Sequence, residues 1–148
     1  MRESDWSSDV CSSDLFDKHV YVLETKTGKL VYKIETGEAI YSTPLIRNDR
    51  LYVASLDKQL YCIDLTTGAT VWKFSTRGRI FASPEILKNK IYIGSNDGRL
   101  YELDADTGKN TAIFQATERI TNKIFYNKET GKIFLPTFAN EIYSLSRI

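Results

Sequence analysis

The chain has 148 residues, of which 26% are charged, and its 20 basic and 19 acidic side chains leave a formal net charge of +1. A balance this even, spread along the whole chain, excludes the clustered basic face that nucleic-acid binding needs. The longest apolar runs are only as long as a strand, so no transmembrane segment is predicted.

Residues 1–15 do not share the pattern that fills the rest of the chain. The run from residue 5 to residue 15, DWSSDVCSSDL, resembles a translated sequencing adapter, and we expect residues 1–15 to be a non-native, disordered leader. A native Ser- and Asp-rich disordered leader is the alternative that the composition allows. Without these residues Lys+Arg falls from 20 to 19 and Asp+Glu from 19 to 15, which gives a net charge of +4. Cys62 is then the only cysteine, which excludes an intrachain disulfide and a cysteine zinc site.

From residue 16 onward the sequence repeats with a period of 40 residues. Repeats of this length are typical of propellers and solenoids, and they decide the fold before any local pattern does. Matching residues keep the step along the chain: Thr27-Gly28 with Thr67-Gly68 and Thr107-Gly108, Tyr21 with Tyr61 and Tyr101, Pro44 with Pro84, Asp57 with Asp97, and Leu60 with Leu100.

Each repeat is predicted to form four short strands. Around the middle repeat these are residues 69–74, 80–86, 90–95 and 99–104, all rich in β-branched and aromatic side chains. Hairpin turns are predicted between strands, as at Asn96-Asp97-Gly98, because glycine accepts a positive φ without a Cβ clash. Several strands are apolar on both faces, which favours four-stranded sheets that stack between two neighbours.

Two blocks of the middle repeat resemble a known family. They are Asp64-x-x-Thr67-Gly68-x-x-x-Trp72 and, after Ser83-Pro84, Ile91-Tyr92-Ile93-Gly94-Ser95-x-Asp97-Gly98-x-Leu100-Tyr101-x-Leu103-Asp104. This pattern resembles the blade repeat of quinoprotein-like propellers, a family named for pyrroloquinoline quinone (PQQ) dehydrogenases that also includes many propellers without quinone. The resemblance covers residues 16–148 and implies an all-β fragment of a β-propeller, built from four-stranded antiparallel blades.

We expect a half blade at residues 16–36, blades at 37–76 and 77–116, and an incomplete blade at 117–148. Propellers usually close with about four to eight blades, so this count predicts a fragment of a longer protein. The last repeat departs from the pattern. Ala112 and Ile124 stand at the positions of Trp72 and Pro84, and residues 127–132 lengthen a hairpin by two residues.

Four features invite a functional interpretation, and each has a structural one that we favour. Tyr32 and Trp72 could stack on a planar cofactor, but an aromatic repeated at this position is expected to wedge between adjacent blades. Asp97 lies in a segment that partly matches a calcium loop, yet no acidic ligand follows at the loop's twelfth position. His19 is expected to be exposed, with no nucleophile beside it. Cys62 is expected to be a small apolar filler of a strand.

The innermost strand of each blade should line the central channel. These strands are expected at residues 40–45, 80–85 and 120–125, where Glu85 and Lys123 are the polar residues that could reach a channel ligand. The family resemblance also implies, for the quinone dehydrogenases, adjacent cysteines stacked on the cofactor and a calcium ligand set. Neither can be assigned to a position here, so no catalytic, cofactor-binding or metal residue is predicted.

The favoured function is therefore a non-catalytic scaffold or binding module, similar to the propeller lipoproteins of outer-membrane assembly. Protein partners or a small ligand would dock at the propeller channel, and the resemblance implies a periplasmic or other extracytoplasmic location. The alternative is a fragment of a PQQ- and calcium-dependent dehydrogenase whose cofactor residues lie in blades outside this sequence. Sequence upstream would distinguish the two, because fold alone does not determine function.

Overall fold

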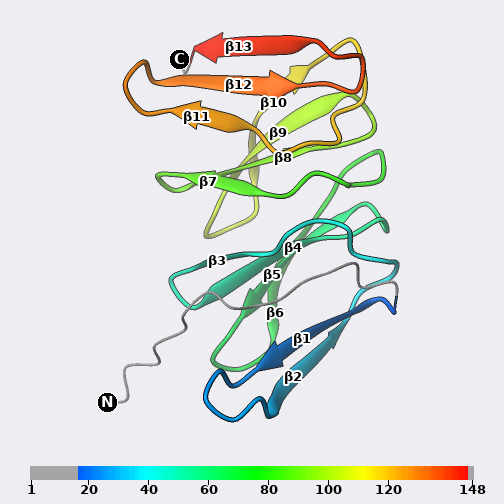
Figure 1. Cartoon of the computed structure of the whole chain (residues 1–148), viewed down its shortest axis with the longest axis vertical. Helices are drawn as coiled ribbons and strands as arrows, with labels where there is room; N and C mark the ends of the chain where they lie inside the picture. Colours follow the sequence, from blue (N-terminus) through cyan, green and yellow to red (C-terminus); the bar gives the residue numbers. More distant parts are fainter. Residues whose placement is uncertain (1–16, 147–148) are drawn as a thin grey trace.

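The computed structural model describes residues 17–146, and all of its regular elements in this range are β-strands (Figure 1). Within these residues there is no helix that could cross a membrane. The strands are β1 (His19–Leu23), β2 (Leu30–Glu35), β3 (Leu45–Arg47), β4 (Arg50–Ala54), β5 (Gln59–Asp64), β6 (Thr70–Ser75), β7 (Glu85–Leu87), β8 (Lys90–Gly94), β9 (Arg99–Asp104), β10 (Asn110–Gln115), β11 (Phe125–Asn127), β12 (Lys132–Pro136) and β13 (Ile142–Ser146).

The described strands form antiparallel sheets in chain order. They are β1-β2, β3-β4-β5-β6, β7-β8-β9-β10 and β11-β12-β13. The sheets lie one above the other, from β1-β2 at the bottom of the view to β11-β12-β13 at the top (Figure 1). The predicted all-β architecture of stacked, four-stranded antiparallel sheets is confirmed.

A separate apolar cluster fills each of the three spaces between neighbouring sheets. The strands β4 and β5 are buried on both faces because alternate residues enter different clusters. Leu51 and Val53 pack with Val20 of the first sheet, whereas Tyr52 and Leu60 belong to the cluster shared with the third sheet. Each fully buried aliphatic side chain contributes roughly 1.5–3 kcal/mol. The sheets are thus held together face to face, as the doubly apolar strands predicted.

Tyr32 and Trp72 lie between sheets, as expected from their repetition. The Trp72 ring is 5.9 Å from the Tyr52 ring, and its Nε1 donates to the carbonyl of Ala105 in the next sheet at 3.1 Å. Tyr32 donates its hydroxyl to the carbonyl of Thr66 in the second sheet. Both aromatic side chains therefore join one sheet to the next.

The innermost strands are shorter than predicted and begin later. The expected strands at residues 40–45, 80–86 and 120–125 are replaced by the three-residue strands β3, β7 and β11. The preceding segment bonds instead to a turn of its own sheet, as when Asn96 donates its amide to the carbonyl of Arg79. This arrangement turns Ile80 fully into the core, with 0% of its surface exposed, and leaves residues 81–84 irregular.

Candidate functional site

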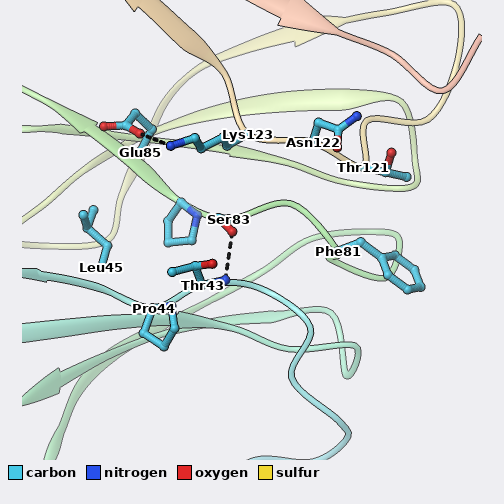
Figure 2. Close-up of a pocket in the computed structure, with 10 residues that line it drawn as sticks. Thr43, Pro44, Leu45, Phe81, Ser83, Glu85, Thr121, Asn122 and Lys123 are labelled. Carbon is cyan, nitrogen blue, oxygen red and sulfur yellow. Dashed lines mark hydrogen bonds and ion pairs between the residues drawn. The ribbon is translucent and has the colours of Figure 1, made fainter. Parts of the chain in front are cut away.

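A hollow of about 390 Å³ lies where the segments that lead into β3, β7 and β11 come together (Figure 2). Three consecutive sheets contribute to it, each from an equivalent stretch of the repeat. The lining residues are Thr43, Pro44, Leu45, Phe81, Ser83, Pro84, Glu85, Thr121, Asn122 and Lys123.

Hydrogen bonds between equivalent positions hold the walls of this hollow. The amide of Thr43 donates to Oγ of Ser83 at 2.8 Å, which links residues 40 positions apart in neighbouring sheets. Next to this contact, the buried hydroxyl of Ser42 donates to the carbonyl of Ala54 at 2.8 Å. Pro44 and Pro84 follow these polar residues and restrict the backbone at the entry to β3 and β7. The short inner strands therefore begin from fixed positions.

Glu85 and Lys123 are the sequence-predicted polar residues of this region, and the structure brings them together. Nζ of Lys123 lies 4.0 Å from Oε2 of Glu85, and Figure 2 shows the two side chains reaching toward each other across the hollow. The Lys123 side chain is 53% exposed and the Glu85 side chain is 31% exposed. An ion pair this open contributes roughly 0–1 kcal/mol, so both charges can be redirected to a bound partner.

An aromatic pair that the sequence analysis missed lies at the edge of the same hollow. The rings of Tyr41 and Phe81 have centroids 5.6 Å apart, and Tyr41 is 42% exposed. Close by in the chain, Arg79 and Glu38 form an ion pair at 3.8 Å between neighbouring sheets. The signal in the sequence was the 40-residue step from Tyr41 to Phe81, which matches the step of the repeat.

The Asp97 carboxylate is used inside the protein, as the predicted hairpin turn requires. Its Oδ1 accepts the amide of Arg99 at 2.9 Å, and its Oδ2 accepts the Tyr101 hydroxyl at 2.6 Å and the amide of Arg77 at 3.0 Å. Burial, and secondly the bond to Asp97, raise the pKa of Tyr101. Among residues 17–146 there is no group of three or more His, Cys, Asp and Glu side chains placed to hold a metal ion.

His19 and Cys62 lie away from the hollow. His19 is in β1, where its Nδ1 is 2.6 Å from the carbonyl oxygen of Asp17, and only 25% of its side chain is exposed. His19 is therefore partly exposed, whereas an exposed side chain was expected. Cys62 is fully buried, and burial raises the pKa of its thiol, which fits the expected filler of a strand.

The hollow therefore offers noncovalent binding groups. Phe81 and the two prolines supply apolar surface, Thr121 supplies a hydroxyl, and the Glu85–Lys123 pair supplies both charges. The Ser83 hydroxyl already accepts the Thr43 amide. An arrangement of apolar walls with a few polar groups is typical of sites that dock a ligand or a peptide segment.

Comparison with known proteins identifies one family and several solved structures with the same fold. The family model for the outer membrane protein assembly factor BamB, a PQQ-type repeat, matches residues 16–128. No curated protein sequence matches the chain. The crystal structure of BamB from Moraxella catarrhalis is similar with a TM-score of 0.80 and 21% identity, over 90% of this chain and 41% of that one.

Two further solved structures share the fold. The computationally designed protein Ika8 gives a TM-score of 0.79 at 13% identity, over 90% of this chain and 42% of its own. The quinohemoprotein alcohol dehydrogenase ADHIIG from Pseudomonas putida HK5 gives 0.70 at 20% identity, over 79% of this chain and 25% of its own. This chain thus spans less than half the length of each of these three structures.

Proposed function

The chain belongs to the PQQ-like repeat family of the outer membrane protein assembly factor BamB, and from this premise we propose that it acts as a non-catalytic scaffold. Its role would be to hold a protein partner at the hollow in front of β3, β7 and β11. The observation that carries the proposal is the convergence of three sheets on that hollow. Such loops on a rigid scaffold are where binding residues usually gather.

A peptide segment of a partner protein suits the chemistry of the hollow. Phe81 and Pro84 would contact its apolar side chains, and the hydroxyl of Thr121 would hydrogen-bond its backbone. The exposed Glu85–Lys123 pair would open so that each charge meets an opposite charge on the partner. A small polar ligand would use the same groups and is the alternative occupant.

The family role at the outer membrane leads us to propose an envelope location for the protein, with its partner among the proteins of outer-membrane assembly. In-cell photo-crosslinking tests this directly. A photoreactive amino acid replaces Phe81, and a matched control carries it at Lys128, which is exposed in the turn between β11 and β12. We expect a crosslink to an outer-membrane assembly protein from position 81 and none from position 128. Equal crosslinking from both positions, or none from position 81, would contradict the proposal.

The alternative of a quinone-dependent dehydrogenase makes a different prediction. The fold likeness to ADHIIG is the observation that keeps it open. We expect no saturable binding when the chain is titrated with PQQ and calcium and followed by absorbance and calorimetry. Saturable binding of the pair in the micromolar range would overturn the scaffold proposal and support the dehydrogenase.

A further inference from the structure

The Ser83 amide in the hollow lacks the hydrogen-bond acceptor that the repeat supplies one interface earlier. There the amide of Thr43 in the second sheet donates to Oγ of Ser83 in the third sheet at 2.8 Å. One repeat further on, the residue in the accepting position is Lys123, whose ammonium group can only donate. Within residues 17–146 no acceptor is paired with the Ser83 amide. The interface between the third and fourth sheets therefore leaves a backbone donor without a partner.

Hydrogen-bond donors gather around this amide. Lys123 brings its ammonium group, and Thr121, two residues earlier in the chain, brings a hydroxyl to the same hollow (Figure 2). The Ser83 hydroxyl accepts from the Thr43 amide and still carries a hydrogen that it can donate. The hollow thus offers a backbone N–H, hydroxyl groups and a positive charge to an incoming acceptor.

The Glu85–Lys123 ion pair leaves the ammonium group open to a second acceptor. Their separation of 4.0 Å is longer than the roughly 2.7–2.9 Å of a charge-assisted hydrogen bond. Among the residues that line the hollow, Glu85 is the only acid. A neutral carbonyl from a ligand could accept the Ser83 amide but would give Lys123 no opposite charge. A carboxylate satisfies both groups, because each of its oxygens accepts hydrogen bonds and it carries a full negative charge.

We propose that the hollow binds a carboxylate of the partner peptide, whose oxygens accept from the Ser83 amide and the Lys123 ammonium group. This inference rests on the proposed function, since it names the group of the peptide that the hollow recognises. Lys123 determines the specificity. A serine at this position would accept the Ser83 amide, as Ser83 accepts the Thr43 amide, and would close the site.

Calorimetric titration of the full chain with three short peptides tests the proposal. They are acetyl-Leu-Asp-Leu-amide, acetyl-Leu-Asn-Leu-amide and acetyl-Leu-Asn-Leu with a free terminal carboxylate. We expect a Kd of about 0.1–1 mM for the Asp peptide, as befits a small ligand, and binding at least about tenfold weaker for the amidated Asn peptide. The third peptide distinguishes a terminal carboxylate from a side-chain carboxylate as the source. Equal binding by all three peptides, or no binding by either acid, would overturn the carboxylate site.

Variants of Lys123 separate the charge from the free amide. Lys123→Arg should bind the Asp peptide within about threefold of the parent chain, whereas Lys123→Ser should weaken binding at least about tenfold. Lys128→Ser, in the exposed turn between β11 and β12, is the matched control and should stay within about twofold. Lys123→Ser should also unfold at a higher urea concentration than Lys123→Ala, because only the serine can accept the Ser83 amide. Equal urea midpoints, or undiminished binding by Lys123→Ser, would contradict the assignment.

Glu85→Gln gives a test in the opposite direction. Because it removes the carboxylate that competes for Lys123, it should tighten binding of the Asp peptide by about threefold. Weaker binding would mean that Glu85 supports the ligand, which would contradict the proposed competition. Crosslinking from position 81 measures the proposed function separately. If that crosslink forms while the Asp and amidated Asn peptides bind alike, the carboxylate site is wrong and the docking hollow stands.

Discussion

At the scale of single residues, Asn96 is the one residue in the described part of the chain with an enclosed side-chain polar atom that finds no hydrogen-bond partner. Its Oδ1 is enclosed just after β8, where Asn96 follows Leu56 by one repeat. An unpaired buried carbonyl destabilises a fold by roughly 1–3 kcal/mol, since it loses its bonds to water. The neighbouring repeat avoids this loss by placing a leucine there.

We therefore expect Asn96→Leu to raise the free energy of unfolding by about 1 kcal/mol, because the variant removes the unpaired carbonyl. The reciprocal change Leu56→Asn should lower it. Urea denaturation of the two variants and the parent chain measures both effects. A destabilised Asn96→Leu would mean that the amide has a structural role that its contacts do not explain.

Tyr61 gives the molecule a predictable response to alkaline pH. Burial, and secondly the hydrogen bond to Asp57, raise the pKa of Tyr61 from 10.0 to about 12. The folded state therefore favours the protonated hydroxyl. This contribution to stability is complete below pH 10 and is lost as the pH rises toward 12.

Replacement of Tyr61 by Phe should accordingly flatten the loss of stability between pH 10 and 12. The variant starts from a lower stability at pH 8, because it lacks the bond to Asp57. Urea denaturation at pH 8, 10 and 11 separates the two effects, and lysine titration is common to both proteins. Equal slopes for parent and variant would show that Tyr61 does not titrate in this window.

At the scale of elements, the 40-residue period predicted the order of strands and the stacking of sheets but not the inner strands. Residues 80–86 contain enough apolar side chains to be taken for a full strand. In the structure Ile80 is used to fill the core, and the backbone around it bonds to a turn. Side-chain pattern alone does not show where a backbone amide donates, so only Glu85 and Ile86 of this stretch lie in a strand, β7.

In the last sheet, a hydrogen bond differs from the one that the repeat predicts. In the third sheet the hydroxyl of Tyr101 donates to Asp97, four positions before it. The corresponding residue before Tyr143 is Ala139, and Glu141 accepts the Tyr143 hydroxyl instead at 3.2 Å. The lengthened hairpin was predictable, because Gly131 supplies the left-handed residue that closes its turn, at a φ of 67°.

The candidate hollow was predictable only in part. Glu85 and Lys123 could be named because they are polar residues in strands expected to line the channel. Their distance of 4.0 Å depends on how neighbouring sheets are rotated, which no sequence pattern gives. The sequence shows that Ala112 stands in place of Trp72, but that a cleft lies beside Ala112 depends on how neighbouring sheets pack.

Two glycines in equivalent turns allow a matched test of sheet packing. Gly28 lies between β1 and β2, and Gly108 lies between β9 and β10. Gly28 and Gly108 have nearly the same backbone, with φ of 67° and 68°. A Cβ on Gly28 would meet open space, whereas one on Gly108 would lie 2.6 Å from the Trp72 ring of the preceding sheet. The two glycines thus differ in whether a neighbouring sheet presses against them.

Gly28→Ala should lower the free energy of unfolding by about 1–2 kcal/mol, which is the strain of a left-handed alanine. Gly108→Ala should lose about 1–3 kcal/mol more, because the Trp72 ring has to move from its seat. Urea denaturation of both variants measures the difference. Equal losses would mean that Trp72 moves freely, and the ring would then not hold the two sheets together.

At the scale of the whole molecule, the two end sheets expose side chains that the central sheets bury. Leu23 in the first sheet is 50% exposed, while Ile63 at the same position of the next repeat is 0% exposed. Ile142 in the last sheet is 70% exposed, while its counterpart Leu100 is 4% exposed. Apolar surface of this kind on the ends of a stack favours association with further sheets.

The central claim is that these sheets are propeller blades, each stabilised by neighbours on both faces. Size-exclusion chromatography with light scattering of the full chain tests it most directly. We predict self-association or aggregation, with a mass above that of the monomer, and the same behaviour after removal of residues 1–15. A monodisperse monomer that unfolds cooperatively on heating would contradict the claim, because the described sheets would then be stable without further blades.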